Sequence, residues 1–268
     1  MRPVGIAVVV LALAGCGGSE ALKATTVAGH PGSLVPAGDH RLYAECTGSG
    51  SPTVVLDSGG EGGVESWTEV QPRIARFTRV CSYDRAGNGL SPGVPGTRTA
   101  SDQAEDLARL VSELDLGPVV VVGHSWGGLI DRLFASSHPD STAGVVQVDA
   151  SVGNTAAAHL SFEGLDVAHS VGEAARVSTL ADVPLVVLTA GKPPFAPRWL
   201  ELQDELARLS SNAVHALALY TDHGSFPTYF GQPEVIATAT KAVVDAVRTG
   251  SRLPPCRRVF SPIRARCR

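Results

Sequence analysis

Short runs of β-branched and aliphatic residues alternate along the chain with longer segments in which apolar residues recur at helical spacing. Such runs are typical of strands that are buried on both faces of a parallel sheet. The expected strands are residues 42–46, 53–56, 78–83, 118–122, 144–148, 185–188 and 215–219. The alternation predicts an α/β fold with a mostly parallel sheet and helices on both faces.

Three segments predict helices that each bury one apolar face. In residues 101–114 that face comprises Ala104, Leu107, Val111 and Leu114. In residues 197–210 it comprises Trp199, Leu202, Leu206 and Leu209, and Pro197 suits a first turn, where the missing N–H is harmless. A last helix is expected from residue 233 towards residue 248.

Length and charge favour one globular domain. The chain has 268 residues with a formal net charge of −4, and it shows no internal repeat. We expect residues 32–250 to form the domain, followed by a C-terminal tail of residues 251–268 that is rich in Arg and Cys. Without a basic field to attract phosphates, a nucleic-acid partner is not expected.

The N-terminus reads as an export signal. Arg2 precedes an apolar run over residues 4–14, which is too short to span a bilayer and ends in Leu13-Ala14-Gly15-Cys16. The tetrapeptide resembles the lipobox of bacterial lipoproteins, which implies removal of residues 1–15 and lipidation of Cys16. The protein is then expected on the outer face of the cell membrane, held only by this anchor. The alternative is a plain secretory signal and a secreted protein. Residues 16–31 are expected to form a flexible tether.

Four further cysteines, Cys46, Cys81, Cys256 and Cys267, would then face an oxidising compartment. Four cysteines allow three pairings. We favour Cys46–Cys81, because they lie on two strands expected to be neighbours, and Cys256–Cys267, which closes a short loop in the tail. The alternative for the first pair is two small buried thiols.

The sequence Gly123-His124-Ser125-Trp126-Gly127 joins the apolar run 119–122 to a helical stretch that ends at His138. A Gly-x-Ser-x-Gly turn between a strand and a helix is tight enough to strain the serine backbone and lift its hydroxyl above the sheet. The N–H of Trp126 then begins the helix, where an oxyanion is stabilised. Ser125 is therefore the candidate nucleophile.

Together with this turn, the sequence of residues 33–248 resembles sequences of the α/β-hydrolase superfamily. The resemblance implies an eight-stranded type of sheet and a small cap over residues 151–182. After the strand 53–56, the family's His-Gly-x is replaced by Ser58-Gly59-Gly60. The resemblance makes the N–H of Gly60 the second oxyanion donor beside that of Trp126, and Ser58 in place of histidine leaves a neighbouring residue as the alternative. The loop 83–91 resembles a family loop with a structural role.

The resemblance also places the base and the acid. His223 lies in a loop between the strand 215–219 and the final helix, where the family carries its catalytic histidine. No carboxylate directly follows the strand 185–188, where most relatives have the acid. A subset of the superfamily places it one strand earlier, which here gives Asp149. Asp204 and Asp222 are the alternatives.

We therefore expect a serine hydrolase that cleaves a small carboxylic ester through an acyl-enzyme and needs no cofactor or metal. Its expected partner is a small-molecule ester or amide substrate. Ser-Trp-Gly also occurs in aminopeptidase relatives of the fold, so amide hydrolysis is the nearest enzymatic alternative. A non-catalytic, lipid-anchored binding protein on the same fold is the alternative from another class.

Overall fold

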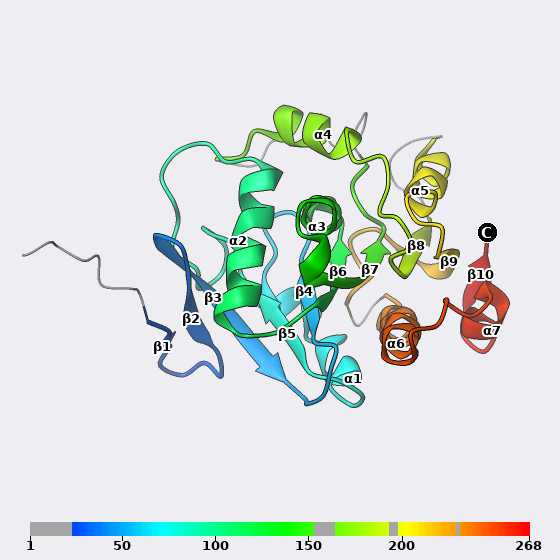
Figure 1. Ribbon diagram of the computed structural model, residues 1–268, viewed down its shortest axis with the longest axis horizontal. Helices are drawn as coiled ribbons and strands as arrows, with labels where there is room; N and C mark the ends of the chain where they lie inside the picture. Colours follow the sequence, from blue (N-terminus) through cyan, green and yellow to red (C-terminus); the bar gives the residue numbers. More distant parts are fainter. Residues whose placement is uncertain (1–22, 153–163, 193–197, 229–230) are drawn as a thin grey trace, which may run out of the picture.

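The computed structural model describes residues 23–152, 164–192, 198–228 and 231–268. In this part of the chain the strands form one sheet in the order β1-β2-β3-β5-β4-β6-β7-β8-β9-β10 (Figure 1). Their bounds are Thr25–Thr26, Ser33–Ala37, His40–Thr47, Val54–Asp57, Val80–Tyr83, Val119–His124, Thr142–Val148, Leu185–Lys192, Ala213–Asp222 and Ala265–Cys267 for β1 to β10. The strands β5, β4, β6, β7, β8 and β9 run parallel, and the outer strands are antiparallel to their neighbours.

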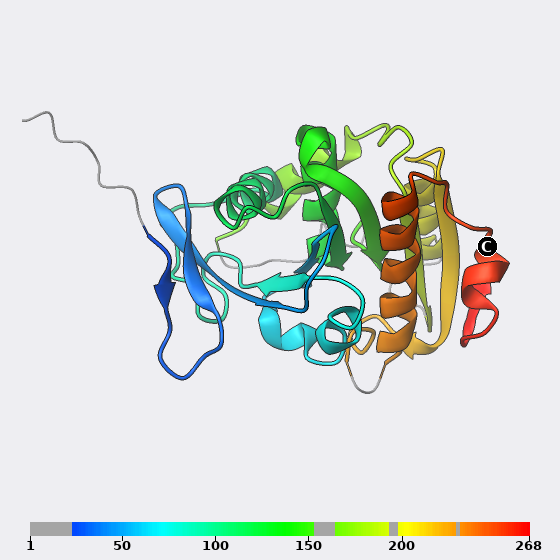
Figure 2. The same ribbon diagram turned by 60° about the horizontal axis from the view of Figure 1, so that its bottom comes forward.

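Helices cover both faces of the sheet, and each face has its own apolar core (Figure 2). One face carries α2 (Ala100–Glu113), α3 (Trp126–Ser137), α4 (Val167–Ala175) and α5 (Trp199–Ala207). The other carries η1 (Val64–Trp67), α1 (Gln71–Ile74), α6 (Pro233–Thr249) and α7 (Cys256–Phe260). A short turn, η2 (Pro139–Ser141), follows α3. Because β4, β6 and β7 are buried on both faces, their sequences are nearly continuous apolar runs. The predicted α/β class is confirmed.

All seven predicted strands are present, as β3 to β9, and the three predicted helices are α2, α5 and α6. The sheet is larger than the expected eight-stranded type, because β1, β2 and β10 extend it at its two edges. β1 and β10 have only two and three residues and β2 contains a proline, so none of them has the local pattern of a strand. Their stability comes from pairing with a neighbour. Within the described residues, no helix is both long enough and apolar enough to span a bilayer.

Two predicted segments differ from expectation. The tether was expected to extend to residue 31, yet Thr25 and Thr26 pair with Leu34 and Ser33 of β2. The C-terminal tail is part of the fold, because β10 pairs with β9 and Phe260 of α7 is buried in the core. The predicted signal peptide, Cys16 and the cap residues 153–163 lie outside the described residues. The described part of the segment predicted to be a cap includes α4, whose Ser170 hydroxyl accepts the Ala100 N–H at the start of α2 at 2.8 Å.

The structure contains the disulfides Cys46–Cys81 and Cys256–Cys267, which is the pairing favoured above. The first joins facing residues of β3 and β5. The second ties α7 to β10 and so fixes the tail on the edge of the sheet.

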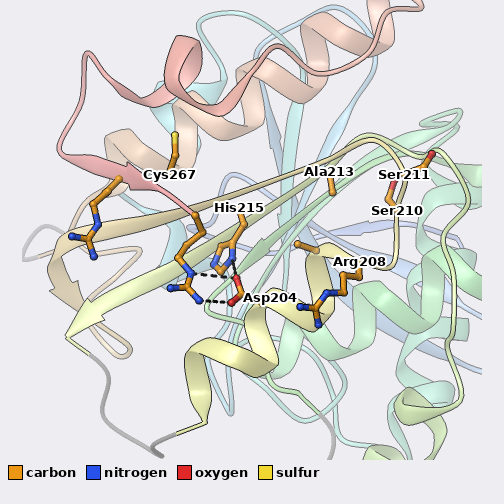
Figure 3. A pocket seen from close by; sticks show the side chains of 10 residues that line it. Asp204, Arg208, Ser210, Ser211, Ala213, His215 and Cys267 are labelled. Atoms are coloured by element: carbon orange, nitrogen blue, oxygen red, sulfur yellow. Dashed lines mark hydrogen bonds and ion pairs between the residues drawn. The ribbon is translucent and has the colours of Figure 1, made fainter.

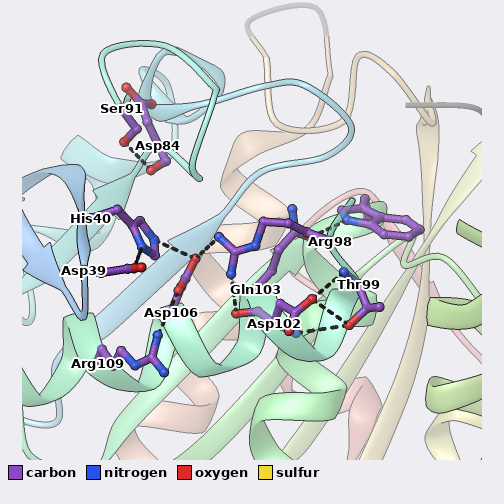
Figure 4. Close-up of polar contacts among 11 residues, drawn as sticks. Asp39, His40, Asp84, Ser91, Arg98, Thr99, Asp102, Gln103, Asp106 and Arg109 are labelled. Carbon is purple, nitrogen blue, oxygen red and sulfur yellow. Dashed lines mark hydrogen bonds and ion pairs between the residues drawn. The ribbon is translucent and has the colours of Figure 1, made fainter. Parts of the chain in front are cut away.

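The start of α2 is fixed by a reciprocal cap. The Thr99 hydroxyl accepts the Asp102 N–H at 3.2 Å, and the Asp102 carboxylate accepts the Thr99 N–H at 2.8 Å (Figure 4). Four residues into the helix, the Gln103 side chain accepts the indole N–H of Trp126 at 2.8 Å. Through this contact α2 supports the residue that follows Ser125.

Candidate active site

Ser125 occupies the turn between β6 and α3. Its backbone has φ 52° and ψ −115°, a conformation that side chains other than glycine rarely adopt. The flanking glycines have no room for a side chain. A Cβ on Gly123 would lie 2.5 Å from the Gly128 nitrogen, and a Cβ on Gly127 would lie 2.3 Å from the Asp57 carbonyl oxygen. The Gly-x-Ser-x-Gly pattern therefore has a steric cause here.

The structure brings Ser125, His223 and Asp149 together in one hydrogen-bonded chain. His223 lies in the turn after β9, and its Nε2 is 2.9 Å from the Ser125 hydroxyl oxygen. Its Nδ1 is 2.7 Å from Asp149 Oδ2, and Asp149 is fully buried at the carboxyl end of β7. With the proton assigned to Nδ1, the ring donates to the carboxylate and leaves Nε2 to accept the serine proton. This is the arrangement of a Ser-His-Asp triad.

Main-chain bonds tie the nucleophile to the acid turn. The Ser125 N–H donates to the Val148 carbonyl at 3.1 Å, and the Ser151 N–H donates to the Ser125 carbonyl at 2.8 Å. The Asp149 N–H donates to the Leu188 carbonyl at 2.6 Å. The strands β6, β7 and β8 thereby fix the separation of nucleophile and acid.

The alternative carboxylates have other partners. Asp204 of α5 accepts from His215 Nδ1 at 2.8 Å and forms an ion pair with Arg268 beside a surface cleft of about 840 Å³ (Figure 3). Asp222 is exposed and accepts the Ser225 N–H at 3.0 Å. The geometry therefore favours Asp149 as the partner of His223.

The predicted oxyanion loop passes directly against the nucleophile. A Cβ on Gly59 would lie 2.9 Å from the Ser125 Cβ. Arg85 holds this loop in place, because its guanidinium donates to the carbonyls of Ser58 and Gly60 and forms an ion pair with Asp57. This support agrees with the structural role expected for the loop 83–91. The assignments of the Gly60 and Trp126 N–H groups as oxyanion donors stay predictions.

His124, which directly precedes Ser125, holds the loop that carries His223. Its Nε2–H donates to the His223 carbonyl at 2.8 Å, and the two ring centroids lie 4.9 Å apart. Burial, with the neighbouring His223 as a second cause, lowers the pKa of His124 to about 4. His124 is therefore neutral near pH 7 and adds no positive charge beside His223.

A buried carboxyl group lies beneath the turn. Asp131 of α3 is fully buried, and its two oxygens have no hydrogen-bond partner within the described residues. Burial raises the pKa of Asp131 well above its usual range, and the nearby Asp57 carboxylate adds to the effect. Asp131 is therefore protonated at pH values where an exposed aspartate is ionised.

This protonation predicts a pH-dependent stability. The native state binds the Asp131 proton more tightly than the unfolded state, so wild-type stability falls as pH rises from about 4 towards the native pKa, by roughly 1.4 kcal/mol per pH unit at most. Asp131→Asn keeps a neutral side chain and should lose this dependence, gaining stability relative to wild type as pH rises. Urea unfolding at several pH values measures it. Asp140→Asn, at an exposed position, is the control, and wild-type pH dependence in Asp131→Asn would contradict the assignment.

Within the described residues, no group of three or more His, Cys, Asp or Glu side chains is arranged to hold a metal ion. The hydrogen-bonded chain of Ser125, His223 and Asp149 is made of protein side chains.

Comparison with known proteins identifies related sequences. A family model described as alpha/beta hydrolase fold matches residues 52–178. The RutD protein of Yersinia enterocolitica is 36% identical over 112 residues, covering 40% of each chain. A proline iminopeptidase of Clostridium botulinum is 38% identical over 93 residues, covering 34% of this chain and 31% of that protein. The chain thus spans well under half the length of these two relatives.

Solved structures show the same architecture over most of the chain. A thermophilic esterase from Thermogutta terrifontis superimposes with a TM-score of 0.64 at 22% identity, covering 84% of this chain and 98% of the esterase. A hydrolase from Pseudomonas aeruginosa PA01 gives a TM-score of 0.67 at 18% identity, covering 81% and 99%. The family model, the related sequences and the shared fold agree. The chain therefore has the α/β-hydrolase fold, and its residues 52–178 match the model of that family.

Proposed function

We propose that this protein is a serine hydrolase that cleaves a small carboxylic ester through an acyl-enzyme on Ser125. The hydrogen-bonded chain from Ser125 through His223 to the buried Asp149 is the observation that carries this proposal. A nucleophile, a base in contact with it and an acid that orients the base are the three parts that acyl transfer requires.

In the proposed reaction, His223 Nε2 takes the hydroxyl proton of Ser125 while the serine oxygen attacks the ester carbonyl. The N–H groups of Trp126 and Gly60 would stabilise the oxyanion that forms. The C–O bond then breaks, the alcohol leaves with the proton from His223, and the acyl group remains on Ser125. Water, deprotonated by His223, then attacks the acyl carbon. The bond from this carbon to the Ser125 oxygen breaks, His223 returns the proton to Ser125, and the carboxylic acid leaves. Asp149 stabilises the imidazolium in both halves of the cycle.

A cleft of about 620 Å³ beside the oxyanion loop supports a small and polar substrate. It is lined mainly by glycine backbone and by polar or charged side chains, among them Glu61, Arg85, Asn88, Arg98 and Gln103 (Figure 4 shows the last two). The two arginines already have carboxylate partners, Asp57 and Asp106. A neutral polar group therefore fits this cleft better than a long alkyl chain.

A substrate panel tests the proposal. We expect kcat/KM to be highest for esters with short acyl chains of about two to four carbons, which suit a small polar cleft. Faster cleavage of aminoacyl amides than of esters would replace ester by amide hydrolysis, the activity named for the Clostridium botulinum relative. No turnover of either class, together with no reaction with a fluorophosphonate, would leave a non-catalytic binding protein.

We also propose that Cys16 carries a lipid anchor, which the tetrapeptide Leu13-Ala14-Gly15-Cys16 supports. In a bacterium that processes lipoproteins, the protein should be recovered in the membrane fraction, and Cys16→Ser should move it to the soluble fraction, because acyl chains supply the membrane affinity. Fractionation and the mass of the N-terminal peptide measure this. A mature protein that lacks residue 16 would contradict the anchor but not export.

A further inference from the structure

The two oxygens of the Asp149 carboxylate have different partners. Oδ2 accepts from His223, and Oδ1 accepts the indole N–H of Trp199 at 2.8 Å and the Ala190 N–H at 3.1 Å. Trp199 is the first residue of α5 and is only 3% exposed. Its ring stands edge-on to that of His223, with centroids 6.1 Å apart and planes at 85°. One tryptophan thus contacts both the acid and the base.

A second donor from the same helix holds the acid turn. The Gln203 side-chain amide donates to the Ala150 carbonyl at 2.8 Å. Trp199 and Gln203 are four residues apart, so both lie on the face of α5 that meets the end of β7. Leu202 and Leu206 on this helix are buried in the core. The helix is therefore anchored independently of its two polar contacts.

The acid turn requires this support for a geometric reason. Asp149 has φ 43°, so its backbone is held in a conformation that costs free energy. The last torsion of an aspartate side chain is broad, so a carboxylate bound at one oxygen alone could rotate. Donors on Oδ1 leave Oδ2 aimed at His223.

We propose that Trp199 is a positioning residue for the acid: its indole N–H fixes the Asp149 carboxylate and takes up part of its charge. This inference rests on the proposed function, because it assigns a role within the same triad. Among the described residues, His124 of β6 and His215 of β9 are titratable groups that interact electrostatically with Asp149. Neither changes when Trp199 is replaced.

The inference predicts the kinetics of Trp199→Phe on an ester that the wild type hydrolyses. Losing a hydrogen bond to a charged group should lower kcat by roughly 10-fold to 100-fold with little change in KM. More of the carboxylate charge would then act on His223, so the imidazolium is favoured and the acid limb of the kcat/KM profile moves to higher pH. A role in packing alone would lower activity without moving this limb.

Trp67→Phe is the matched control. Trp67 is also fully buried, and its indole nitrogen has no hydrogen-bond partner within the described residues. This variant removes the same atoms and should leave the acid limb in place. The proposal is overturned if the wild type is active and Trp199→Phe keeps kcat within about twofold with an unmoved profile. A wild type that neither turns over esters nor reacts with a fluorophosphonate overturns the proposed function instead.

If Trp199→Phe does not fold, NMR of the ¹⁵N-labelled wild type tests the same contact. Three tryptophans give three indole signals, which Trp67→Phe and Trp126→Phe assign by elimination. The Trp199 signal should shift across the pH range of the acid limb of the kcat/KM profile, and again after phosphonylation of Ser125. A Trp199 signal that responds to neither change would overturn the proposal.

Discussion

Ser125→Ala should lower ester turnover by roughly three to six orders of magnitude, because the other members of a triad cannot supply a nucleophile. The backbone turn should persist, because alanine keeps the Cβ and removes only the hydroxyl oxygen. Steady-state kinetics on the best ester of the substrate panel measures the loss, and circular dichroism reports the fold. The expected result is a folded protein that has lost its turnover.

Ser137→Ala is the matched control for this variant. Ser137 ends the same helix, α3, and its hydroxyl donates to the Leu133 carbonyl at 2.8 Å on the surface. This change should leave turnover within about twofold of wild type, as is usual for a surface substitution. Equal turnover by Ser125→Ala and wild type would rule out Ser125 as the nucleophile.

Asp149→Asn should lower kcat by about four orders of magnitude. The amide cannot stabilise an imidazolium, and it favours the wrong tautomer of His223. The fold should be nearly unchanged, because asparagine has almost the same shape and can still accept from Trp199 and Ala190. Kinetics on the same ester measure the effect.

Asp204→Asn is the comparison that separates the candidate acids. Asp204 pairs with His215 and Arg268 beside a surface cleft, so its loss should be nearly silent in kcat. The triad would have to be redrawn if Asp149→Asn kept more than about a tenth of wild-type kcat while Asp204→Asn lost its activity.

The centre of the sheet could be predicted because its strands are buried on both faces and leave apolar runs in the sequence. The strands at the two edges of the sheet could not be predicted in this way. The tail segment Ala265–Cys267 contains an arginine and no long apolar run, and it is a strand because β9 offers an unpaired edge and a disulfide holds it there. These edge strands form because they pair with a neighbouring strand, and such pairing is not visible in the local sequence pattern.

Some residues of the candidate site could likewise be predicted from the sequence, and others could not. Ser125 was marked by the steric demands of its turn and His223 by its place after a late strand, and the structure places their side chains in contact. The acid remained open between Asp149, Asp204 and Asp222, because only the tertiary fold decides which carboxylate reaches His223. The contacts of His124 and Trp199 were missed, since a histidine beside a nucleophile and a tryptophan on an apolar helix face both read as packing.

The most direct test of the triad is to map where the wild-type protein reacts with a fluorophosphonate. Peptide mass spectrometry should find a single adduct, on Ser125, and its rate of formation should fall as the pH is lowered, because the base must be unprotonated to take the serine proton. An adduct on another residue, or a protein that stays unmodified at every pH, would contradict the assignment of Ser125 and His223 as nucleophile and base.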